Sequence, residues 1–409
     1  MLLSALPPGP FARLSALLQD ISPGKPPISL AVGDPSGPVP DFVKDALAAA
    51  LSSFGTYPAI TGTQIWRNAA AGWLNRRFAL NGAVDPEHNV LPLAGTREGL
   101  FSAVLPFMPL SKGGAKPIVA MPNPFYQCYA AAALAGGAQP LYVPSREENG
   151  FLPDYAALPE DTLKRLVAVY ICSPSNPEGA VADGAYWRTL FALADKYDFL
   201  VLADECYADI WFDAPPLSAL SARLSASGGL SRLLSFHSLS KRSGLPGMRS
   251  GLVTGEASLI ERLRAFRNVA GPTVPGPLLA ASAALWNDET HVEANRAGYQ
   301  EKMAAAQRIL GSRMRRPGGG LFLWLNVGDG VDFARRAWAQ QGVRLLPGAY
   351  MGREIDRPGR PSAAQDPLRG ARCSEEKHQE NPGFSYVRVA LVRDLSTILT
   401  ALERVREIL

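Results

Sequence analysis

Short apolar runs alternate with amphipathic stretches through the middle of the chain, from about residue 115 to residue 255. The runs PIVAM, PLYV, LVAVYI, FLVLAD, RLLSF and GLVTG are apolar almost continuously and rich in Val, Ile and Leu. Such runs are typical of strands that are covered on both faces. The segments between them show helical periodicity, as in AYWRTLFALADKY, and would supply the crossover connections. The pattern predicts an α/β fold with a mostly parallel sheet.

The pattern changes after about residue 285. A long amphipathic segment, HVEANRAGYQEKMAAAQRIL, precedes a glycine turn, the strand-like GLFLWLNV, further helix and a last strand-like run, YVRVALV. We predict a smaller α+β domain here, completed by the N-terminal arm. The expected boundaries are residues 1–44 for that arm, 45–285 for the large domain and 286–409 for the small domain. Residues 352–385 are rich in Pro, Gly and charge, which predicts a long surface loop.

Composition and charge exclude several classes of protein. The 409 residues exceed the roughly 250 to 300 that one core supports, which favours two domains. The net charge is only +4, from 41 basic and 37 acidic residues, so neither nucleic acid nor an anionic membrane is an expected partner. The basic run Arg313, Arg315, Arg316 is interpreted as a solvated helix end. No stretch approaches the roughly 20 apolar residues of a membrane span, and the N-terminus lacks the features of a signal peptide.

The cysteines and histidines point to no metal site. The four cysteines are widely spaced and form no C-x-x-C pair, which argues against a disulfide framework and against zinc. We therefore expect a cytoplasmic protein. The histidines show no ligand spacing, and His237 is interpreted as a packing residue. These residues are Cys128, Cys172, Cys206 and Cys373, and His88, His237, His291 and His378.

Polar residues follow three of the predicted strands. LVAVYI leads to residues 173–176, FLVLAD ends at Asp204 and is followed by Tyr207, and RLLSF leads to Ser238 and Lys241. Open α/β sheets bind ligands at the carboxyl ends of their strands. The three groups should therefore share one cleft, which predicts an enzyme site without naming its chemistry.

Lys241 lies among serines and glycines in SFHSLSKRSGLPGMRSG, eight residues before Arg249. A lysine with a covalent role must be able to lose its proton, and burial or a neighbouring cation lowers its pKa. An exposed loop is the simplest alternative. A serine nucleophile activated by lysine is another, but the S-D-N and K-T-G tripeptides that would accompany it do not occur in the sequence.

Several motifs occur in the order and at the intervals of one large family. SPSNPEG, ADECYADI and SLSKRSGLPGMRSG resemble motifs of the fold-type I, pyridoxal-phosphate (PLP)-dependent aminotransferases of class I/II, and the resemblance extends from AVGDPSGP to YVRVALV. It implies a mostly parallel seven-stranded sheet sandwiched by helices, with a smaller α+β domain. It also implies an enzyme that moves amino groups between amino acids and 2-oxo acids, with PLP as its cofactor.

The resemblance implies a role for each matching residue near the PLP ring. Lys241 would bond covalently to the cofactor aldehyde and then act as general base and acid. Asp204 would hold the proton on the pyridine nitrogen, although a helix cap would also explain it. Tyr207 and Asn176 would bond the phenolate oxygen, with a simple Asn-Pro turn as the alternative for Asn176. Tyr126 would stack on the ring, or be a core aromatic.

A second set of residues is implied for the PLP phosphate. LAGTREGLF offers a glycine-opened helix start, whose backbone amides can bind an anion. The implied phosphate-binding residues are Gly95, Thr96, Arg97, Ser238, Ser240 and Arg249. Tyr57 matches the tyrosine that reaches the phosphate of the neighbouring subunit, which implies a homodimer.

Arg388 lies inside the otherwise apolar run YVRVALV. Burying an unpaired guanidinium is costly, so a planar anion should face it, and a structural ion pair is the main alternative. The resemblance implies that Arg388 binds the substrate α-carboxylate, with Gly33 and Asn176 beside it.

Finer features resemble the bacterial succinyldiaminopimelate transaminases of lysine and cell-wall biosynthesis, notably GTREGLF, PNPFYQCY and DECYADIWFD. This implies ping-pong amino transfer from glutamate to N-succinyl-2-amino-6-oxopimelate. VGDPSGPVP and the long loop depart from that branch. An aspartate, aromatic or acetylated-diamine aminotransferase, a C–S lyase and a non-catalytic PLP-binding protein remain alternatives. Arg67 and Arg97 are the candidates for binding the distal carboxylate, with surface or structural roles as alternatives.

Overall fold

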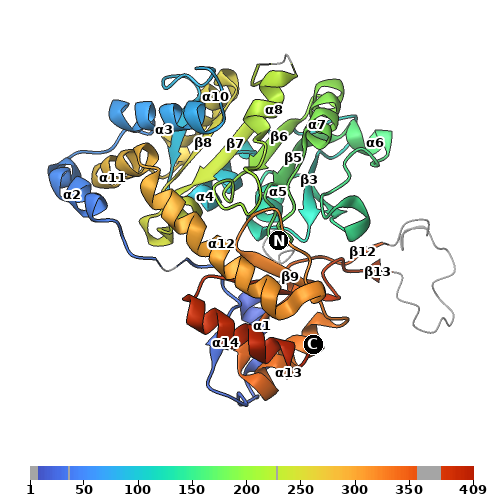
Figure 1. The fold of residues 1–409 in the computed structure, drawn as a ribbon. Helices are drawn as coiled ribbons and strands as arrows, with labels where there is room; N and C mark the ends of the chain where they lie inside the picture. The colour runs from blue at the N-terminus through green and yellow to red at the C-terminus, as the bar shows by residue number, and fades with distance from the viewer. Residues whose placement is uncertain (1–7, 36, 227–228, 357–378) are drawn as a thin grey trace.

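A seven-stranded sheet forms the centre of the computed structural model, which describes residues 8–35, 37–226, 229–356 and 379–409 (Figure 1). The strand order is β2-β8-β7-β6-β5-β3-β4. β8 pairs antiparallel with β2 and β7, and the other neighbours are parallel, which confirms the mostly parallel sheet. The strands are β2 (Val90–Leu93), β3 (Ile118–Asn123), β4 (Gln139–Pro144), β5 (Leu166–Cys172), β6 (Leu200–Asp204), β7 (Leu233–Ser238) and β8 (Gly251–Gly255).

Helices cover both faces of this sheet because its strands are apolar on both sides. One face packs against α3 (Gln64–Arg77), α7 (Gly184–Tyr197), α8 (Ala219–Ser225) and α11 (Gly276–Asn287). The other packs against α4 (Thr96–Ser102), α5 (Gln127–Ala135) and α10 (Ala257–Ala270). Within the described ranges, no helix is long and apolar enough to cross a membrane.

Local capping sets where several of these helices begin. The Asp183 carboxylate accepts from the backbone N–H of Tyr186 at 2.8 Å at the start of α7. The Thr63 side chain does the same for Trp66 at the start of α3. Each cap satisfies a backbone donor that the helix itself leaves free. The remaining short elements of this part are α2 (Asp41–Ala49), α6 (Glu160–Leu163), η2 (Leu51–Gly55), η3 (Leu105–Phe107), η4 (Glu147–Asn149) and η5 (Pro246–Met248).

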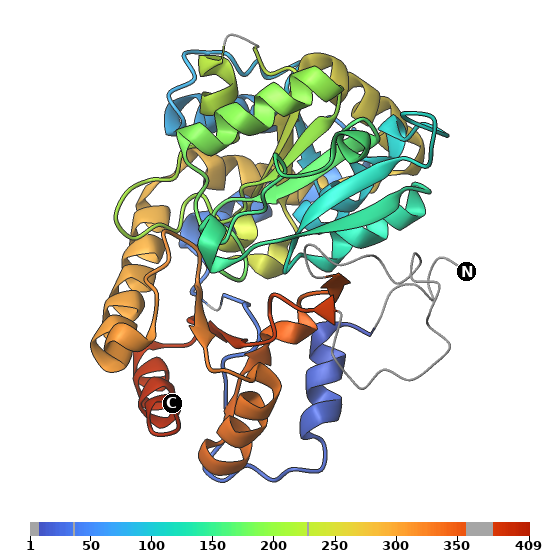
Figure 2. The same ribbon diagram turned by 90° about the vertical axis from the view of Figure 1, so that its right-hand side faces the viewer.

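The smaller α+β domain has its own core beneath the large sheet (Figure 2). Its three-stranded antiparallel sheet has the order β11-β14-β9. The N-terminal arm belongs to it, because β1 (Ile28–Ser29) pairs in parallel with β10 (Val343–Arg344) and α1 (Pro10–Leu18) packs beside α13 (Gly330–Gln341). The domain boundaries themselves remain predictions. Its other elements are α12 (Thr290–Leu310), η6 (Gly311–Arg313), β9 (Phe322–Asn326), β11 (Leu346–Pro347), η7 (Gly348–Tyr350), β14 (Tyr386–Ala390) and α14 (Leu395–Arg406).

The predicted loop 352–385 contains a short strand toward each of its two ends. β12 (Ile355–Asp356) and β13 (Gln379–Glu380) pair antiparallel there, which the polar composition did not indicate. The ladder satisfies backbone groups that a loop would leave to water. Residues 357–378, which include Cys373 and His378, lie outside the described residues.

Candidate active site

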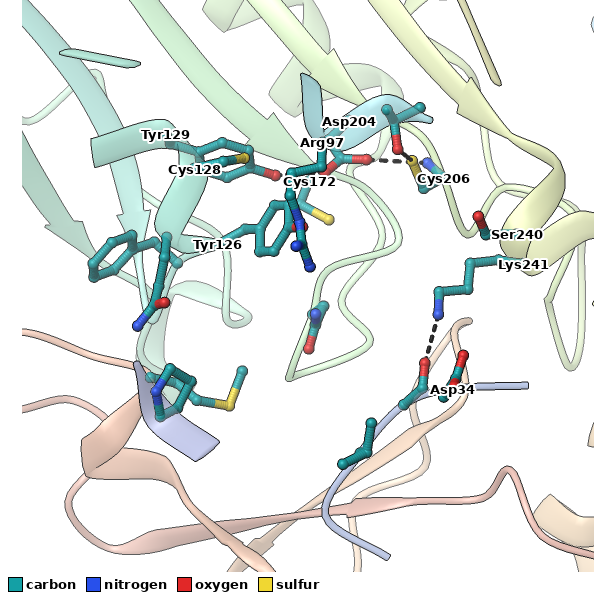
Figure 3. Close-up of a pocket in the computed structure, with 18 of the residues that line it drawn as sticks. Asp34, Arg97, Tyr126, Cys128, Tyr129, Cys172, Asp204, Cys206, Ser240 and Lys241 are labelled. Carbon is teal, nitrogen blue, oxygen red and sulfur yellow. Dashed lines mark hydrogen bonds between the residues drawn. The ribbon is translucent and has the colours of Figure 1, made fainter. Parts of the chain in front are cut away.

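A cavity of about 1010 Å³ lies where the carboxyl ends of the large sheet face the smaller domain (Figure 3). Its wall combines residues from β6, from the short helix α9 (Leu239–Arg242) after β7, and from β14. The polar groups predicted to share a cleft therefore do so. The predicted site residues that line it are Gly33, Thr96, Arg97, Tyr126, Asn176, Asp204, Tyr207, Ser238, Ser240, Lys241, Arg249 and Arg388.

Lys241 points from α9 into this cavity (Figure 3). Ser238 caps α9 by accepting from the Ser240 N–H at 3.1 Å, so the serines of the motif fix the turn that presents the lysine. The Lys241 Nζ donates to the carbonyl oxygen of Gly33 at 2.5 Å. Burial, with smaller contributions from the nearby guanidiniums of Arg388 and Arg249, lowers the pKa of Lys241 to about 8. A larger share of free amine near neutral pH makes it a competent nucleophile.

Asp204 ends β6 and is buried in the same cavity. Its Oδ2 accepts from the Tyr129 hydroxyl at 2.6 Å, and its Oδ1 accepts from the Cys206 backbone N–H at 3.3 Å. Burial raises the pKa of Asp204, and these hydrogen bonds oppose that rise. Among the described residues no cationic side chain forms an ion pair with it. The carboxylate can therefore accept a cationic N–H from a ligand.

Tyr129 is a residue that the sequence reasoning missed. It lies one helical turn after Tyr126 in PNPFYQCY, and its ring stacks on Tyr170 with centroids 4.3 Å apart. The stack fixes the hydroxyl against Asp204. The second tyrosine of that motif was the available signal, but only the fold brings it to a strand 75 residues away.

Gly95 does not line the cavity, but it makes room for a residue that does. A Cβ at Gly95 would lie 2.1 Å from Nη2 of Arg249, and its φ of 83° favours glycine independently. The Arg249 guanidinium therefore lies against the start of α4, beside Thr96. Arg249 Nη1 donates to the Pro246 carbonyl at 3.0 Å. Backbone amides next to a guanidinium form a setting suited to an anion such as phosphate.

Tyr126 and Arg97 meet on another wall of the cavity. The Arg97 Nε donates to the Tyr126 hydroxyl at 2.5 Å. Burial raises the pKa of Tyr126 to about 12, so it stays a neutral phenol. The bond occupies one edge of the Arg97 guanidinium, which neither of its predicted roles anticipated.

Arg388 is buried in β14 with no carboxylate against it among the described residues. Its Nη1 donates to Asn176 Oδ1 at 3.0 Å, and its Nη2 donates to the Ala31 carbonyl at 2.7 Å. The Phe322 ring lies 4.2 Å from its Cζ. Burial lowers the pKa of Arg388 to about 10. The structural ion pair that was the alternative for Arg388 is therefore not found in this part of the chain.

Gly33 and Tyr207 both pack against Phe322. A Cβ at Gly33 would lie 2.4 Å from the Phe322 ring, so a side chain there would displace the phenyl group beneath Arg388. The Tyr207 ring meets Phe322 edge-on at 5.9 Å. Burial raises the pKa of Tyr207, and its hydroxyl makes no hydrogen bond to any described residue.

Besides Gly95, two further predicted residues lie outside the cavity. Arg67 pairs with Glu87 at 3.1 Å, so its guanidinium is engaged in a structural contact and is not available to a ligand in the cavity. Tyr57 is fully exposed, and its role across a subunit interface remains a prediction.

The chemistry of this donor set fits PLP. Lys241 offers an amine of lowered pKa to an aldehyde, and Asp204 offers a buried carboxylate to a protonated pyridine nitrogen. Arg249, in the space that Gly95 leaves, offers a cation to a phosphate. Each charged part of the cofactor would thus meet a group that lacks an oppositely charged partner among the described residues.

Comparisons with known proteins agree with this geometry. The family model described as aminotransferase class I and II matches residues 25–365. The LL-diaminopimelate aminotransferase of Dehalococcoides mccartyi is 33% identical over 358 residues, which cover 85% of this chain and 89% of that protein. An aminotransferase structure from Neisseria meningitidis superposes with a TM-score of 0.89 at 38% identity, covering 100% of this chain and 99% of that one. The probable N-succinyldiaminopimelate aminotransferase of Thermus thermophilus gives a TM-score of 0.80 at 25% identity, covering 98% and 100%.

Proposed function

The chain belongs to the PLP-dependent class I and II aminotransferases, and we propose that it transfers an amino group from glutamate to N-succinyl-2-amino-6-oxopimelate. The observation that carries this proposal is the meeting of Lys241, Asp204 and Arg388 in one cavity. They provide an amine that can lose its proton and, within the part of the chain that the structure describes, a carboxylate without a paired cation and a guanidinium without a paired carboxylate. An amino acid and PLP together need all three.

The residues of the chain divide the work as follows. Lys241 would leave the Gly33 carbonyl, take the proton from the substrate Cα as general base and later return a proton. PLP supplies, when bound, an electron sink for the charge that remains on that carbon. Asp204 accepts the N–H of the bound ring, and Tyr129 keeps the carboxylate oriented.

Arg388 and Asn176 orient the substrate by its α-carboxylate. The guanidinium is held by Asn176 and Ala31 before any ligand arrives, so little ordering remains when the carboxylate binds. Tyr207 would donate from its hydroxyl to the phenolate oxygen of PLP. Arg249 and Ser238, with the start of α4, would hold the phosphate. Because amino donor and amino acceptor use the same Arg388, the first oxo acid must leave before the second enters.

The choice of substrate rests on two similar proteins whose names refer to diaminopimelate or its succinyl derivative. The succinylated compound is our proposal, because residues of the sequence motifs that carry the finer resemblance line the cavity. The alternative is amino transfer to or from unsuccinylated LL-diaminopimelate, the compound in the name of the Dehalococcoides mccartyi protein.

Half-reactions test the proposal directly. The PLP-loaded protein is mixed with glutamate, N-succinyl-LL-diaminopimelate, LL-diaminopimelate, aspartate or phenylalanine, and the visible absorbance of the cofactor and the oxo acid released are measured. We expect glutamate and the succinylated compound to react fastest. Failure of glutamate would defeat the proposal. A faster reaction of LL-diaminopimelate than of its succinyl derivative would replace the succinyl branch by the unsuccinylated one.

Lys241→Ala separates catalysis from simple PLP binding. We expect the variant to lose the absorbance of the lysine-bound cofactor, and to lose transamination by roughly 100- to 10 000-fold, the usual contribution of a general base. Wild-type absorbance without turnover on any donor would favour a non-catalytic PLP-binding protein instead.

We propose further that the enzyme is a cytoplasmic homodimer. The exposed apolar side chains of Leu51, Phe54, Tyr57 and Ile65, between η2 and the start of α3, support a contact surface on the large domain. Tyr57 would reach the partner's phosphate site from there. Sedimentation of the wild type and of Phe54→Asp tests the dimer, since a charge in that surface should release monomers.

A further inference from the structure

The cavity holds more positive than negative charge. Its charged lining residues are Arg97, Lys241, Arg249, Arg353 and Arg388, against Asp34 and Asp204. Under the proposed function, Lys241 becomes covalently engaged, Asp204 faces the ring nitrogen, Arg249 faces the phosphate and Arg388 faces the α-carboxylate. Arg97 and Arg353 remain without an anion. Of these two, Arg97 already donates to the Tyr126 hydroxyl beside the ring.

Arg353 is held in place by its own backbone. The side chain of Asn123, at the end of β3, donates from Nδ2 to the Arg353 carbonyl and accepts from the Arg353 N–H, both at 2.9 Å. Gly352 permits this approach, because a Cβ there would lie 3.1 Å from Asn123 Oδ1 and 2.5 Å from Asn381 Oδ1. The root of the side chain is thus fixed to the central sheet, near its carboxyl edge.

The guanidinium of Arg353 lies over aromatic rings and has no acidic partner. Its Cζ lies 4.9 Å from the centroid of Phe125, which lines the cavity, and 5.9 Å from that of Tyr142. Its Nη1 donates to the Gly352 carbonyl at 3.1 Å. Across the described residues no carboxylate forms an ion pair with it. The guanidinium also has a hydrogen-bond interaction with the Tyr142 side chain. The remaining N–H donors of its fork suit a carboxylate.

We propose that Arg353 binds the distal carboxylate of the substrate, and so selects long dicarboxylic amino acids and oxo acids. This rests on the proposed function, in which the α-carboxylate occupies Arg388. The two arginines stand on different walls of the cavity: Arg388 in β14 over Phe322, and Arg353 beyond η7 over Phe125. A substrate must therefore carry its second carboxylate at the far end of a chain. The second carboxylate of diaminopimelate and the free carboxylate of its succinyl group share this chemistry.

Amino donors matched in length test the assignment. The PLP-loaded wild type and Arg353→Gln are compared with 2-aminopimelate, which ends in a carboxylate, and with 2-aminooctanoate, which ends in a methyl group. We expect Arg353→Gln to lower kcat/KM for 2-aminopimelate by roughly 10- to 100-fold, the value of a charged hydrogen-bonded contact. The value for 2-aminooctanoate should stay unchanged. Arg353→Lys should recover part of the loss, since the charge returns without the fork geometry.

Arg13→Gln is the matched control. Arg13 lies over the Tyr350 ring at 4.0 Å, beside Arg353 but not in the cavity wall. Removing its charge changes the local field without removing the contact, so kcat/KM for 2-aminopimelate should stay within about twofold of wild type. An equal loss in both variants would assign the effect to the general positive field and overturn the assignment to Arg353.

Binding of pimelate gives a readout that does not depend on turnover. This dicarboxylate has no amino group, and calorimetry with the PLP-loaded protein should show roughly tenfold or greater weakening in Arg353→Gln. Hexanoate should bind the two proteins equally. If the variant binds pimelate and discriminates between the two donors as well as wild type does, the inference is wrong while the proposed function stands. If wild type transfers no amino group but Arg353→Gln still loses pimelate binding, the proposed function fails and the carboxylate site survives.

The separate tests of succinylated and unsuccinylated diaminopimelate then identify which carboxylate Arg353 receives. Loss of kcat/KM in Arg353→Gln for both compounds supports the assignment, and the larger loss identifies the preferred substrate. No loss for either compound overturns it.

Discussion

Two buried arginines in different regions of the molecule have different hydrogen-bond partners: one is bound to a carboxylate and the other to neutral oxygens. Arg267, in α10 beneath the edge of the large sheet, donates from Nη1 to both carboxylate oxygens of Glu98, at 2.7 and 2.6 Å. Arg388, in β14 at the cavity, has only the neutral oxygens of Asn176 and Ala31. The two side chains are almost equally buried, with exposed fractions of 1% and 4%.

The difference separates a charge that serves the fold from one that serves a ligand. Both guanidiniums have an Nε without a hydrogen-bond partner, so an unused donor alone does not distinguish them. The presence or absence of a carboxylate partner does distinguish the two arginines. Around Arg267 the counter-charge belongs to the chain: removing Glu98 leaves a buried guanidinium alone, and removing Arg267 leaves a partly buried carboxylate alone. Around Arg388 the described residues supply hydrogen bonds and no counter-charge, which supports its proposed role in binding the α-carboxylate.

The largest effect is expected at Arg267. Arg267→Met leaves the Glu98 carboxylate without its partner and should lower the free energy of unfolding by about 3 to 5 kcal/mol, measured by urea denaturation. In the double variant Arg267→Met/Glu98→Gln, part of this loss should return. A single variant as stable as wild type would show that the pair contributes little, and the contrast with Arg388 would weaken.

Arg388→Met should have the opposite profile. We expect kcat/KM for every amino donor to fall by at least about 2 kcal/mol of transition-state stabilisation, or roughly 30-fold, because the α-carboxylate loses its charged partner. The free energy of unfolding should be unchanged or higher, since a buried cation without a carboxylate has been removed. A large loss of stability would mean that Arg388 holds the fold as Arg267 does.

Lys241 extends the comparison to pH. In the cofactor-free protein, burial lowers the pKa of Lys241 to about 8, from an ordinary value of 10.5. Below pH 8 Lys241 is protonated in the folded chain, which then carries the whole free-energy cost of burying the ammonium group. Between pH 8 and pH 10.5 the unfolded chain binds more protons than the folded chain, so stability rises with pH and the penalty disappears.

Cofactor-free Lys241→Met should therefore be more stable than wild type at pH 7, by roughly 1 to 2 kcal/mol after solvent screening. The advantage should shrink as the pH approaches 10.5. Urea denaturation of both proteins across this range measures it, and a difference that does not change with pH would contradict the lowered pKa.

The smallest effect is expected at Tyr129. Tyr129→Phe removes one hydrogen bond from Asp204 while keeping the ring stack, and should lower kcat by about 1 kcal/mol, or roughly fivefold, with KM unchanged. Tyr170→Phe is the control, because its hydroxyl donates to the Leu100 carbonyl at 2.6 Å and not to Asp204. Equal losses of kcat in both variants would assign the effect to the stack rather than to the carboxylate.

The strands and the cofactor residues were the parts most accessible from the sequence. LVAVYI, FLVLAD and RLLSF became β5, β6 and β7 because continuous apolar runs are a local signal of strands covered on both faces. Lys241 and Asp204 lie within contiguous motifs, so their neighbours along the chain identified them. The number of strands, in contrast, came from the family resemblance and not from periodicity, and their order is known only from the structure.

Contacts between distant segments could not be predicted in this way. Asn123 holds Arg353 across 230 residues, and Arg388 meets Asn176 across 212. Neither pair leaves a local pattern, because each depends on how the two domains are placed. The ion pair of Arg67 with Glu87, 20 residues further along the chain, fits the structural role that was the alternative for Arg67.

The pairing of β1 with β10 has a consequence for how the protein is made. Ile28 emerges from the ribosome 315 residues before Val343, its neighbour in the ladder (343 − 28). The segment that follows β1 includes Ala31 and Gly33. The Ala31 carbonyl can accept its hydrogen bond from Arg388 only after β14 has been synthesised. Nascent chains can pack the large sheet early, but the wall of the cavity that carries Arg388 cannot form before β14 is synthesised.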